Sequence, residues 1–253
     1  MKKADNMNQD EYKSMFEVEQ THWWYIGLRQ MLFYWIKKIH PKTILDAGCG
    51  TGINQLLLQQ QHYQIDGIDY SDLAVKFSKA RGIKNVKQGM IQKLTFPDAH
   101  FDLIYSLDVL GILTPADSQL ALQEFSRCLK PGGSLILNVA ALQWLYSQHD
   151  VACHLIHRYN QKEIVAILKK NGFSIKKISY RVFFLFPLVA FIKIIEKFQL
   201  KNVKDSEVTG DLKKTNSIFN LLLKPMMWLE FQTIKLLNLP WGTSLWIVAE
   251  KNQ

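Results

Sequence analysis

Cysteine is scarce in this sequence of 253 residues. The chain has three cysteines: Cys49, Cys128 and Cys153. An odd number of cysteines so far apart argues against a disulfide framework and for reduced thiols in the cytoplasm. Near Cys153 lie Asp150, His154 and His157, but their spacing matches no closed zinc pattern. We therefore expect neither a disulfide nor a bound metal.

Long apolar runs are missing as well. A membrane-spanning helix needs about 20 apolar residues, whereas the most apolar segment, residues 184–195, is shorter and contains Pro187 and Lys193. The first residues, Met1 to Asp5, are polar and lack the apolar core of a secretory signal. We expect a cytoplasmic protein without a spanning helix.

Charge is unevenly distributed along the chain. Residues 1–150 contain fifteen Lys and Arg and fifteen Asp and Glu, so the whole formal charge of +9 lies in residues 151–253. That part is also the most apolar. This combination favours an anionic membrane surface or an amphiphilic acidic substrate over nucleic acid. The alternative is an ordinary solvated face of lysines such as Lys169 and Lys176. We expect no nucleic-acid partner and leave peripheral membrane contact open.

The segment from Ile44 to Gly52 is the most informative in the chain. It combines an apolar strand, Asp46 and three alternate glycines, Gly48, Gly50 and Gly52. Glycine adopts positive φ easily and lets a ligand approach the main chain, and the helix that follows offers free N–H groups. A dinucleotide-binding loop would need its third glycine one residue later, where the chain has Ile53. A carboxylate such as Asp46 repels pyrophosphate but suits a cationic ligand.

Asp69 lies at the end of the next predicted strand, residues 64–69. Ser71 follows as the N-cap of a helix from Asp72 to Arg81. Ligands of open α/β sheets bind at the carboxyl ends of the strands. An acid about 20 residues past the glycines can accept hydrogen bonds from both hydroxyls of a ribose. The neighbouring Tyr70 could lie against an adenine ring.

Strands and helices continue to alternate up to Ala140. Further strands are predicted at residues 86–89 and 134–139, and residues 96–107 are predicted to form a turn followed by a strand. Thr114 and Pro115 begin a helix with a capping box and a proline at its first position, and Gly132 and Gly133 follow its end. This alternation predicts an α/β protein with a mostly parallel sheet.

The glycine segment and the order of the features after it resemble the class I S-adenosylmethionine-dependent methyltransferases. The resemblance implies a doubly wound, seven-stranded, Rossmann-like sheet with S-adenosyl-L-methionine as cofactor and S-adenosyl-L-homocysteine as product. It places the cofactor at Asp46, Gly48, Cys49, Gly50, Gly52, Asp69, Tyr70, Met90, Ile91 and Ser106. The family often has an acid followed by a small residue where this chain has Met90 and Ile91. Met90 can only pack on the purine.

The segment Glu19 to Tyr25 resembles a branch of bacterial methyltransferases associated with glycan, lipid and specialised-metabolite pathways. A helix from His22 to about Ile39 is expected to cover the open side of the cofactor. In this arrangement Tyr25 or Trp23 closes the pocket, Arg29 pairs with the cofactor carboxylate, and His22 and Trp23 contact the substrate. The alternative is that these aromatic residues only pack the helix on the sheet.

The substrate side is expected after the fifth strand, where three of the seven histidines fall within nine residues. A hydroxyl acceptor must lose a proton, and histidine titrates near neutral pH. His149 is the first candidate base and His157 the second. The candidate substrate contacts are Trp144, Arg158 and Tyr159. The alternative is that these residues only support the helix that begins at Asn160 with a capping box.

A sixth strand is predicted at residues 173–183 and the last at 244–251, so a helical insertion separates them. We divide the chain into an N-terminal helical cap (1–40), a cofactor-binding catalytic domain (41–183 and 244–253) and the insertion (184–243). The insertion is a substrate lid, an interface or a membrane contact.

The predicted reaction is methyl transfer to an O or N nucleophile of a hydrophobic small molecule, either a specialised metabolite or a lipid or glycan precursor. Two alternatives remain. One is a non-catalytic cofactor-binding partner of another methyltransferase, and the other is a nicotinamide-dependent oxidoreductase. The oligomeric state is left open.

Overall fold

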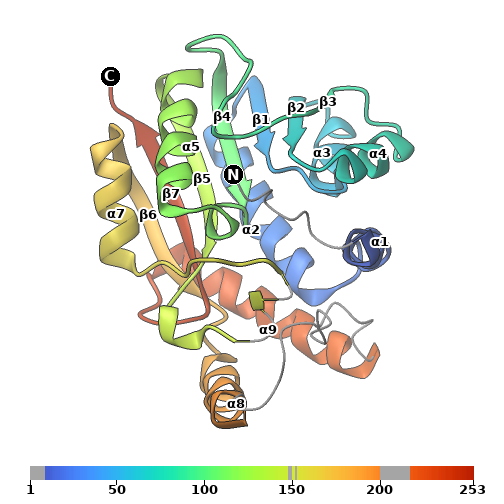
Figure 1. Ribbon diagram of the computed structural model, residues 1–253, viewed down its shortest axis with the longest axis vertical. Helices are drawn as coiled ribbons and strands as arrows, with labels where there is room; N and C mark the ends of the chain where they lie inside the picture. Colours follow the sequence, from blue (N-terminus) through green and yellow to red (C-terminus); the bar gives the residue numbers. More distant parts are fainter. Residues whose placement is uncertain (1–8, 148–149, 152, 200–216) are drawn as a thin grey trace.

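A seven-stranded sheet forms the centre of the protein (Figure 1), whose computed structural model describes residues 9–147, 150–151, 153–199 and 217–253. The strands are β1 (Thr43–Ala47), β2 (Gln64–Asp69), β3 (Val86–Gln88), β4 (Phe101–Leu107), β5 (Leu129–Ala140), β6 (Phe173–Arg181) and β7 (Ser244–Lys251). Their order across the sheet is β3-β2-β1-β4-β5-β7-β6. The first five strands are parallel, and β7 runs antiparallel between β5 and β6. The predicted fold class is confirmed.

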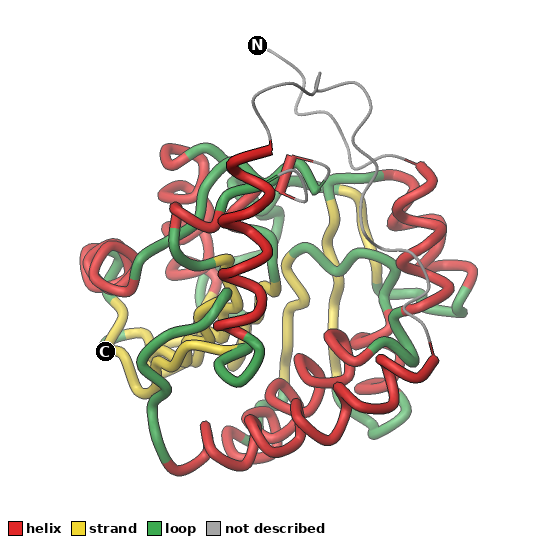
Figure 2. Tube along the Cα trace, turned by 90° about the horizontal axis from the view of Figure 1, so that it is seen from below, coloured by secondary structure: helices red, strands yellow, loops and turns green. Residues whose placement is uncertain are grey.

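Helices cover both faces of this sheet. Their bounds are α1 (Gln9–Val18), α2 (Trp23–Ile39), α3 (Ile53–Gln59), α4 (Asp72–Ala80), α5 (Pro115–Cys128), α7 (Gln161–Lys170), α8 (Phe186–Gln199) and α9 (Ser217–Leu236), with short 3-10 turns η1 (Leu110–Ile112) and η2 (Gln143–Leu145). α5 and α7 pack on one face, and α2, α3 and α9 contribute to the core on the other. Figure 2, seen from below, shows the strands with helices on either side.

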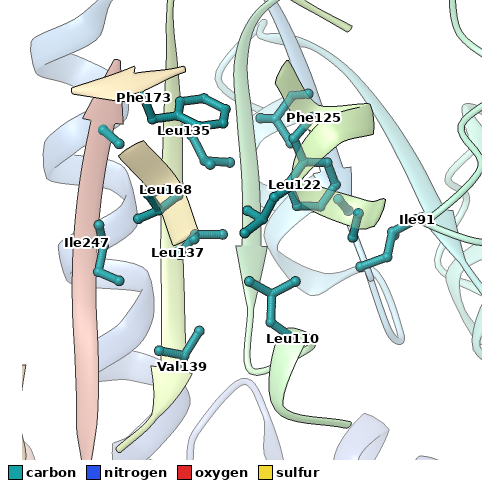
Figure 3. Packing of buried hydrophobic residues seen from close by; sticks show 14 of the residues in the cluster. Ile91, Leu110, Leu122, Phe125, Leu135, Leu137, Val139, Leu168, Phe173 and Ile247 are labelled. Carbon is teal, nitrogen blue, oxygen red and sulfur yellow. The ribbon is translucent and has the colours of Figure 1, made fainter. Parts of the chain in front are cut away.

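The two cores follow from the alternation of side chains along each strand. On β5, Leu135, Leu137 and Val139 face α5 and α7, whereas Ile136 faces the opposite core. Figure 3 shows the first core, where Phe125 and other side chains of the helices meet those of the strands. Because each buried Leu or Phe contributes about 1.5–3 kcal/mol, these two layers hold the sheet rigidly under the site.

The element bounds agree with the sequence except where the backbone turns unexpectedly. β2 and β7 have the predicted limits, and β4 ends at the predicted residue, Leu107. β5 starts at Leu129, earlier than predicted, because Leu129 already pairs with Phe101 before a bulge shifts the register. β6 stops at Arg181, since Val182 has a φ of +61° that an extended strand does not allow.

The described part of the insertion contains two separate helices. α9 lies along α2, and α8 contacts η2. Figure 1 shows α8 and α9 near the lower end of the molecule. Among the described residues, no helix combines the length and the hydropathy that a membrane span requires. The division into cap, catalytic domain and insertion stays a prediction.

Candidate functional site

At two of the three glycine positions in the loop after β1, a larger side chain would clash with neighbouring side chains. Gly48, Gly50 and Gly52 all have positive φ, at 90°, 54° and 81°. A Cβ on Gly48 would lie 2.3 Å from Cγ2 of Val109, and one on Gly52 would lie 2.5 Å from Cδ1 of Ile83. At Gly50 a Cβ would make an ordinary contact, so there only the backbone conformation favours glycine.

Asp69 is held beside this loop by two backbone donors. Its Oδ2 accepts a hydrogen bond from Gly50 N at 2.8 Å, and its Oδ1 accepts one from Ser71 N at 2.9 Å. Burial raises the pKa of Asp69, and these two N–H groups oppose the rise. A carboxylate has about four lone-pair sites. Both oxygens of Asp69 therefore keep capacity for the hydroxyls of a ribose.

Asp46 is almost fully buried and accepts a hydrogen bond from the Tyr105 hydroxyl at 2.7 Å. Burial, together with the nearby carboxylates of Asp69 and Glu19, raises the pKa of Asp46 to about 8, although the hydrogen bond from Tyr105 opposes the rise. Among the described residues, no cation forms an ion pair with Asp46. A buried carboxyl group without an ion-pair partner suits a ligand that carries positive charge.

Arg29 supplies the complementary charge from α2. Its Nη2 donates to Gln20 O at 3.1 Å, whereas its Nη1 is buried and has no hydrogen-bond partner in the described part of the chain. A buried donor without a partner costs about 1–3 kcal/mol. The cofactor carboxylate expected at Arg29 would satisfy this donor, so the residues present fit S-adenosylmethionine.

The N-terminal segment is fastened over the glycine loop. Glu19 accepts hydrogen bonds from the Thr51 hydroxyl and from Nη2 of Arg81. The guanidinium carbon of Arg81 also lies 4.0 Å from the centre of the Phe16 ring. Sequence reasoning missed Thr51 and Arg81, because the two residues join Glu19 over long stretches of chain and no local pattern marks such contacts.

The residues expected around adenine divide into two groups. Tyr70 and Met90 are 46% and 45% exposed beside Asp69, where a purine could lie against them. Ile91 instead packs in the core, and the Ser106 hydroxyl donates to Ala47 O at 2.7 Å. The side chains of Ile91 and Ser106 therefore support the site from beneath. The partly buried Cys49 has its thiol pKa raised by burial, as suits a neutral packing residue.

The aromatic residues at the start of α2 gather around His22. His22 is the N-cap, and its Nδ1 accepts a hydrogen bond from Trp24 N at 3.3 Å. The rings of Trp23 and Tyr25 lie 5.6 and 5.9 Å from the His22 ring. Burial lowers the pKa of His22. Burial also raises the pKa of Tyr25, as do the carboxylates of Glu19 and Asp108. Tyr25 thus lies between the cap and the end of β4.

The segment after β5 differs from the expectation. Arg158 forms a buried ion pair with Asp150, with Nη2 2.6 Å from Oδ1, and the Tyr159 hydroxyl donates to Ser118 Oγ at 3.0 Å. His157 Nε2 lies 2.7 Å from Oε1 of Glu163. The polar atoms of Arg158 and Tyr159 are thus already bonded inside the protein. The two residues therefore support the loop and are not the substrate contacts that we expected.

The capping alternative describes this part of the chain better. Asn160 and Glu163 form the predicted capping box at the start of α7, and His157 joins it through Glu163. Trp144 is 46% exposed, with its ring 6.1 Å from that of Phe186 in α8, and so remains available to a substrate. The first candidate base, His149, lies outside the described residues.

Asp108 is a further acid at this edge that sequence reasoning missed. It follows β4 directly, is open to solvent, and has a φ of +61°. Its Oδ1 accepts a hydrogen bond from Asn138 Nδ2 at 2.5 Å. The available signal was its position after a predicted strand, the same signal that marked Asp69.

Comparison with known proteins agrees with this geometry. A sequence model described as "Methyltransferase domain" matches residues 45–137, which run from β1 to β5 and include the glycine loop, Asp69 and Asp108. Over these residues the chain is similar to the methyltransferase-domain family.

Curated relatives match about half of the chain. A probable S-adenosylmethionine-dependent methyltransferase of Mycolicibacterium smegmatis is 25% identical over 138 residues, which are 53% of each chain. The ubiquinone/menaquinone biosynthesis C-methyltransferase UbiE of Shewanella sediminis is 32% identical over 139 residues, 51% of each chain. The chain thus spans about half the length of the curated relatives it matches.

A solved structure extends the likeness of the fold beyond the methyltransferase domain. A SAM-dependent methyltransferase of Thermotoga maritima superposes with a TM-score of 0.61 and 18% sequence identity. The match covers 96% of both chains. At this identity the likeness concerns the fold alone.

Proposed function

We propose that the protein is an S-adenosylmethionine-dependent methyltransferase that acts on an O or N nucleophile of a hydrophobic small molecule. The observation that carries the proposal is the buried, unpartnered Nη1 of Arg29, which lies on α2 and whose charge faces Glu19, the acid that contacts the glycine loop through Thr51. This donor needs an anion, and the acids of the loop need a cation. The amino acid end of the cofactor provides both charges.

Each residue at the edge has one task in this function. Asp69 accepts hydrogen bonds from the ribose hydroxyls, and Arg29 binds the carboxylate. Asp46 stabilises the positive charge of the cofactor, and Tyr70 and Met90 pack on the purine. When bound, the cofactor supplies a methyl group activated by a sulfonium. The protein contributes alignment of the acceptor and exclusion of water.

Hydrophobic substrates are favoured by the side chains around the open end of the sheet. Trp144 lies against Phe186, and α8 exposes Leu188 (57%) and Phe191 (61%). On α9, Leu222 and Trp228 are 65% and 53% exposed. We propose that the insertion forms the outer wall of the acceptor pocket. Peripheral membrane contact is the competing role for the same side chains.

Calorimetry with S-adenosylmethionine and S-adenosylhomocysteine tests the cofactor assignment. We expect Asp69→Ala and Arg29→Met each to weaken binding by about 10- to 150-fold, the loss of a hydrogen bond to a charged group. Asp66→Ala, an acid on the same strand that is not part of the site, is the matched control. A wild-type protein that binds neither compound would refute the proposal. Binding of both without turnover of any acceptor would favour the non-catalytic alternative.

A further inference from the structure

The end of β4 adjoins the glycine loop directly. β4 pairs with β1 in parallel, and the Ser106 hydroxyl donates to Ala47 O at 2.7 Å. Val109 fills the space in which a side chain on Gly48 would lie. Asp108, immediately before Val109, is therefore next to the loop expected to hold the reactive end of the cofactor.

Asp108 is held in a costly conformation. A φ of +61° is sparsely populated for residues other than glycine, and such outliers concentrate at functional sites. Its N–H donates to Asn138 O at 2.8 Å, and its Oδ1 accepts from Asn138 Nδ2 at 2.5 Å. The surrounding protein raises the pKa of Asp108 by desolvation, and the nearby side chains of Asn138 and Trp24 oppose the rise. The carboxylate is thus fixed in orientation while it remains open to solvent.

A chain of polar contacts links this acid to the insertion. Asn138 Oδ1 accepts a hydrogen bond at 3.2 Å from Nη1 of Arg181, which is 1% exposed. The buried charge of Arg181 faces two carboxylates, Glu230 of α9 and Asp108. Glu230 is fixed in turn, because it accepts hydrogen bonds from Val182 N at 2.8 Å and Phe183 N at 2.6 Å.

Such an arrangement is expensive if its only purpose is stability. Buried ion pairs contribute little net stability, because desolvation offsets their attraction. This series of polar contacts does, however, fix the orientation of the Asn138 amide, and hence the orientation of the Asp108 carboxylate. The phenol of Tyr25 is near enough to feel the charge of Asp108, and it stays neutral because burial and the carboxylates of Glu19 and Asp108 raise its pKa.

We propose that the carboxylate of Asp108 binds the methyl acceptor by accepting a hydrogen bond from the O–H or N–H group of the acceptor. Asn138, Arg181 and Glu230 are then positioning residues. The inference rests on the proposed function and deepens it. The acceptor atom would form a bond to the methyl carbon of the bound cofactor while the carbon–sulfur bond breaks. The electron pair of the broken bond would go to sulfur. The proton of the acceptor passes to Asp108 and then to solvent.

The proposal also narrows the substrate class. A carboxylate at the reacting position repels an acceptor whose nucleophile is a carboxylate or a phosphate. The acceptor is therefore a hydroxyl or an amine, and the anionic part of an amphiphilic substrate, where one exists, lies away from Asp108.

The test uses sinefungin, a cofactor analogue with a primary amine in place of the transferred methyl group. The amine of bound sinefungin takes the position of the methyl group, and so it faces the site from which the acceptor nucleophile would approach. We expect the wild-type protein to bind sinefungin at least about 10-fold more tightly than S-adenosylhomocysteine, as one charge-assisted hydrogen bond would provide. In Asp108→Asn and Asp108→Ser this preference should fall about 10-fold, with the affinity for S-adenosylhomocysteine changed less than about threefold.

Further variants separate positioning from general damage. Glu230→Gln should lower the preference in part, and Glu230→Asp should restore some of it, at unchanged affinity for S-adenosylhomocysteine. Asp98→Asn and Glu250→Gln, acids away from this edge, are the matched controls, and thermal melting verifies that each variant is folded.

Two results would overturn the inference: a preference unchanged in both Asp108 variants, or an equal loss of affinity for both compounds. Absence of any binding of S-adenosylhomocysteine to the wild-type protein would instead refute the proposed function itself.

Discussion

Glu19 and Arg81, 62 positions apart in the sequence, form a buried ion pair beside the glycine loop. Glu19 follows α1 and also accepts the hydroxyl of Thr51, which belongs to the loop itself. The pair thereby connects three parts of the chain: the N-terminal cap, the loop and the end of α4. The cap is bound to the cofactor site through charges that are almost completely hidden from water.

Removal of one partner of this pair should be severe. Glu19→Gln or Arg81→Met leaves a buried charge without compensation, which typically costs about 3–5 kcal/mol. We expect a loss of this order in the free energy of unfolding, measured with urea. The double variant should lose less than the sum of the two single losses. Asp72→Asn breaks the exposed pair with Lys76 and serves as the control, with no measurable change expected. Similar losses in both cases would contradict the role assigned to Glu19.

Two glycines with similar φ should respond differently to alanine. At Gly48 a Cβ would lie 2.3 Å from Val109 Cγ2, whereas at Gly132, with φ of +74°, it would meet nothing within 4 Å. Gly132→Ala should cost about 1–2 kcal/mol of stability, from backbone strain alone. Gly48→Ala adds a clash with a stiff β-branched side chain and should cost distinctly more. Chemical denaturation of both variants measures the difference, and equal losses would show that the loop has more space than the structure indicates.

The stability of the cofactor-free protein should depend on Asp46. Burial raises its pKa from 3.8 to about 8, so between these values the native state holds a proton that the unfolded state has released. Stability contributed by this group therefore falls as pH rises from about 4 to 8, by at most about 1.4 kcal/mol per pH unit. Asp46→Asn should remove this component. Denaturation of both proteins at pH 5 and 7.5 would show it, and parallel pH profiles would disprove the raised pKa.

Lipid binding distinguishes the two roles of the insertion. If α8 forms a pocket wall, the protein should stay away from anionic vesicles in flotation at both low and high salt. The membrane role would be favoured if the protein floated with the vesicles at low salt, if Phe191→Ser abolished this flotation, and if the control Leu120→Ser on α5 did not. Nearby lysines would add about 1 kcal/mol each on an anionic surface, and salt would screen this attraction.

His149 stays a candidate base on the sequence evidence. The hypothesis that His149 is the base and the hypothesis that Asp108 is the base predict different rates of methyl transfer to a hydroxyl. If His149 is the base, His149→Ala should abolish the pH dependence of the rate near neutral pH. If Asp108 takes the proton, that substitution leaves the rate almost unchanged.

The sequence by itself determined the local structure of this protein and half of its site. Positive-φ glycines, the Ser71 and Asn160 caps and the strand before Asp69 are signals carried within a few residues, because they depend on backbone conformation and adjacent hydrogen bonds. The place of Asp69 then follows from the general rule that parallel strands end at one edge.

Only the tertiary structure decided which polar side chains face the site. Arg158 and Tyr159 looked like substrate contacts, yet Asp150 and Ser118 bind them inside the protein. Asp108 gained its role from Asn138, and Asn138 gained its orientation from Arg181. Such partners lie far apart in the chain. Their meeting depends on how the sheet, the cap and α9 pack together, and no local pattern encodes it.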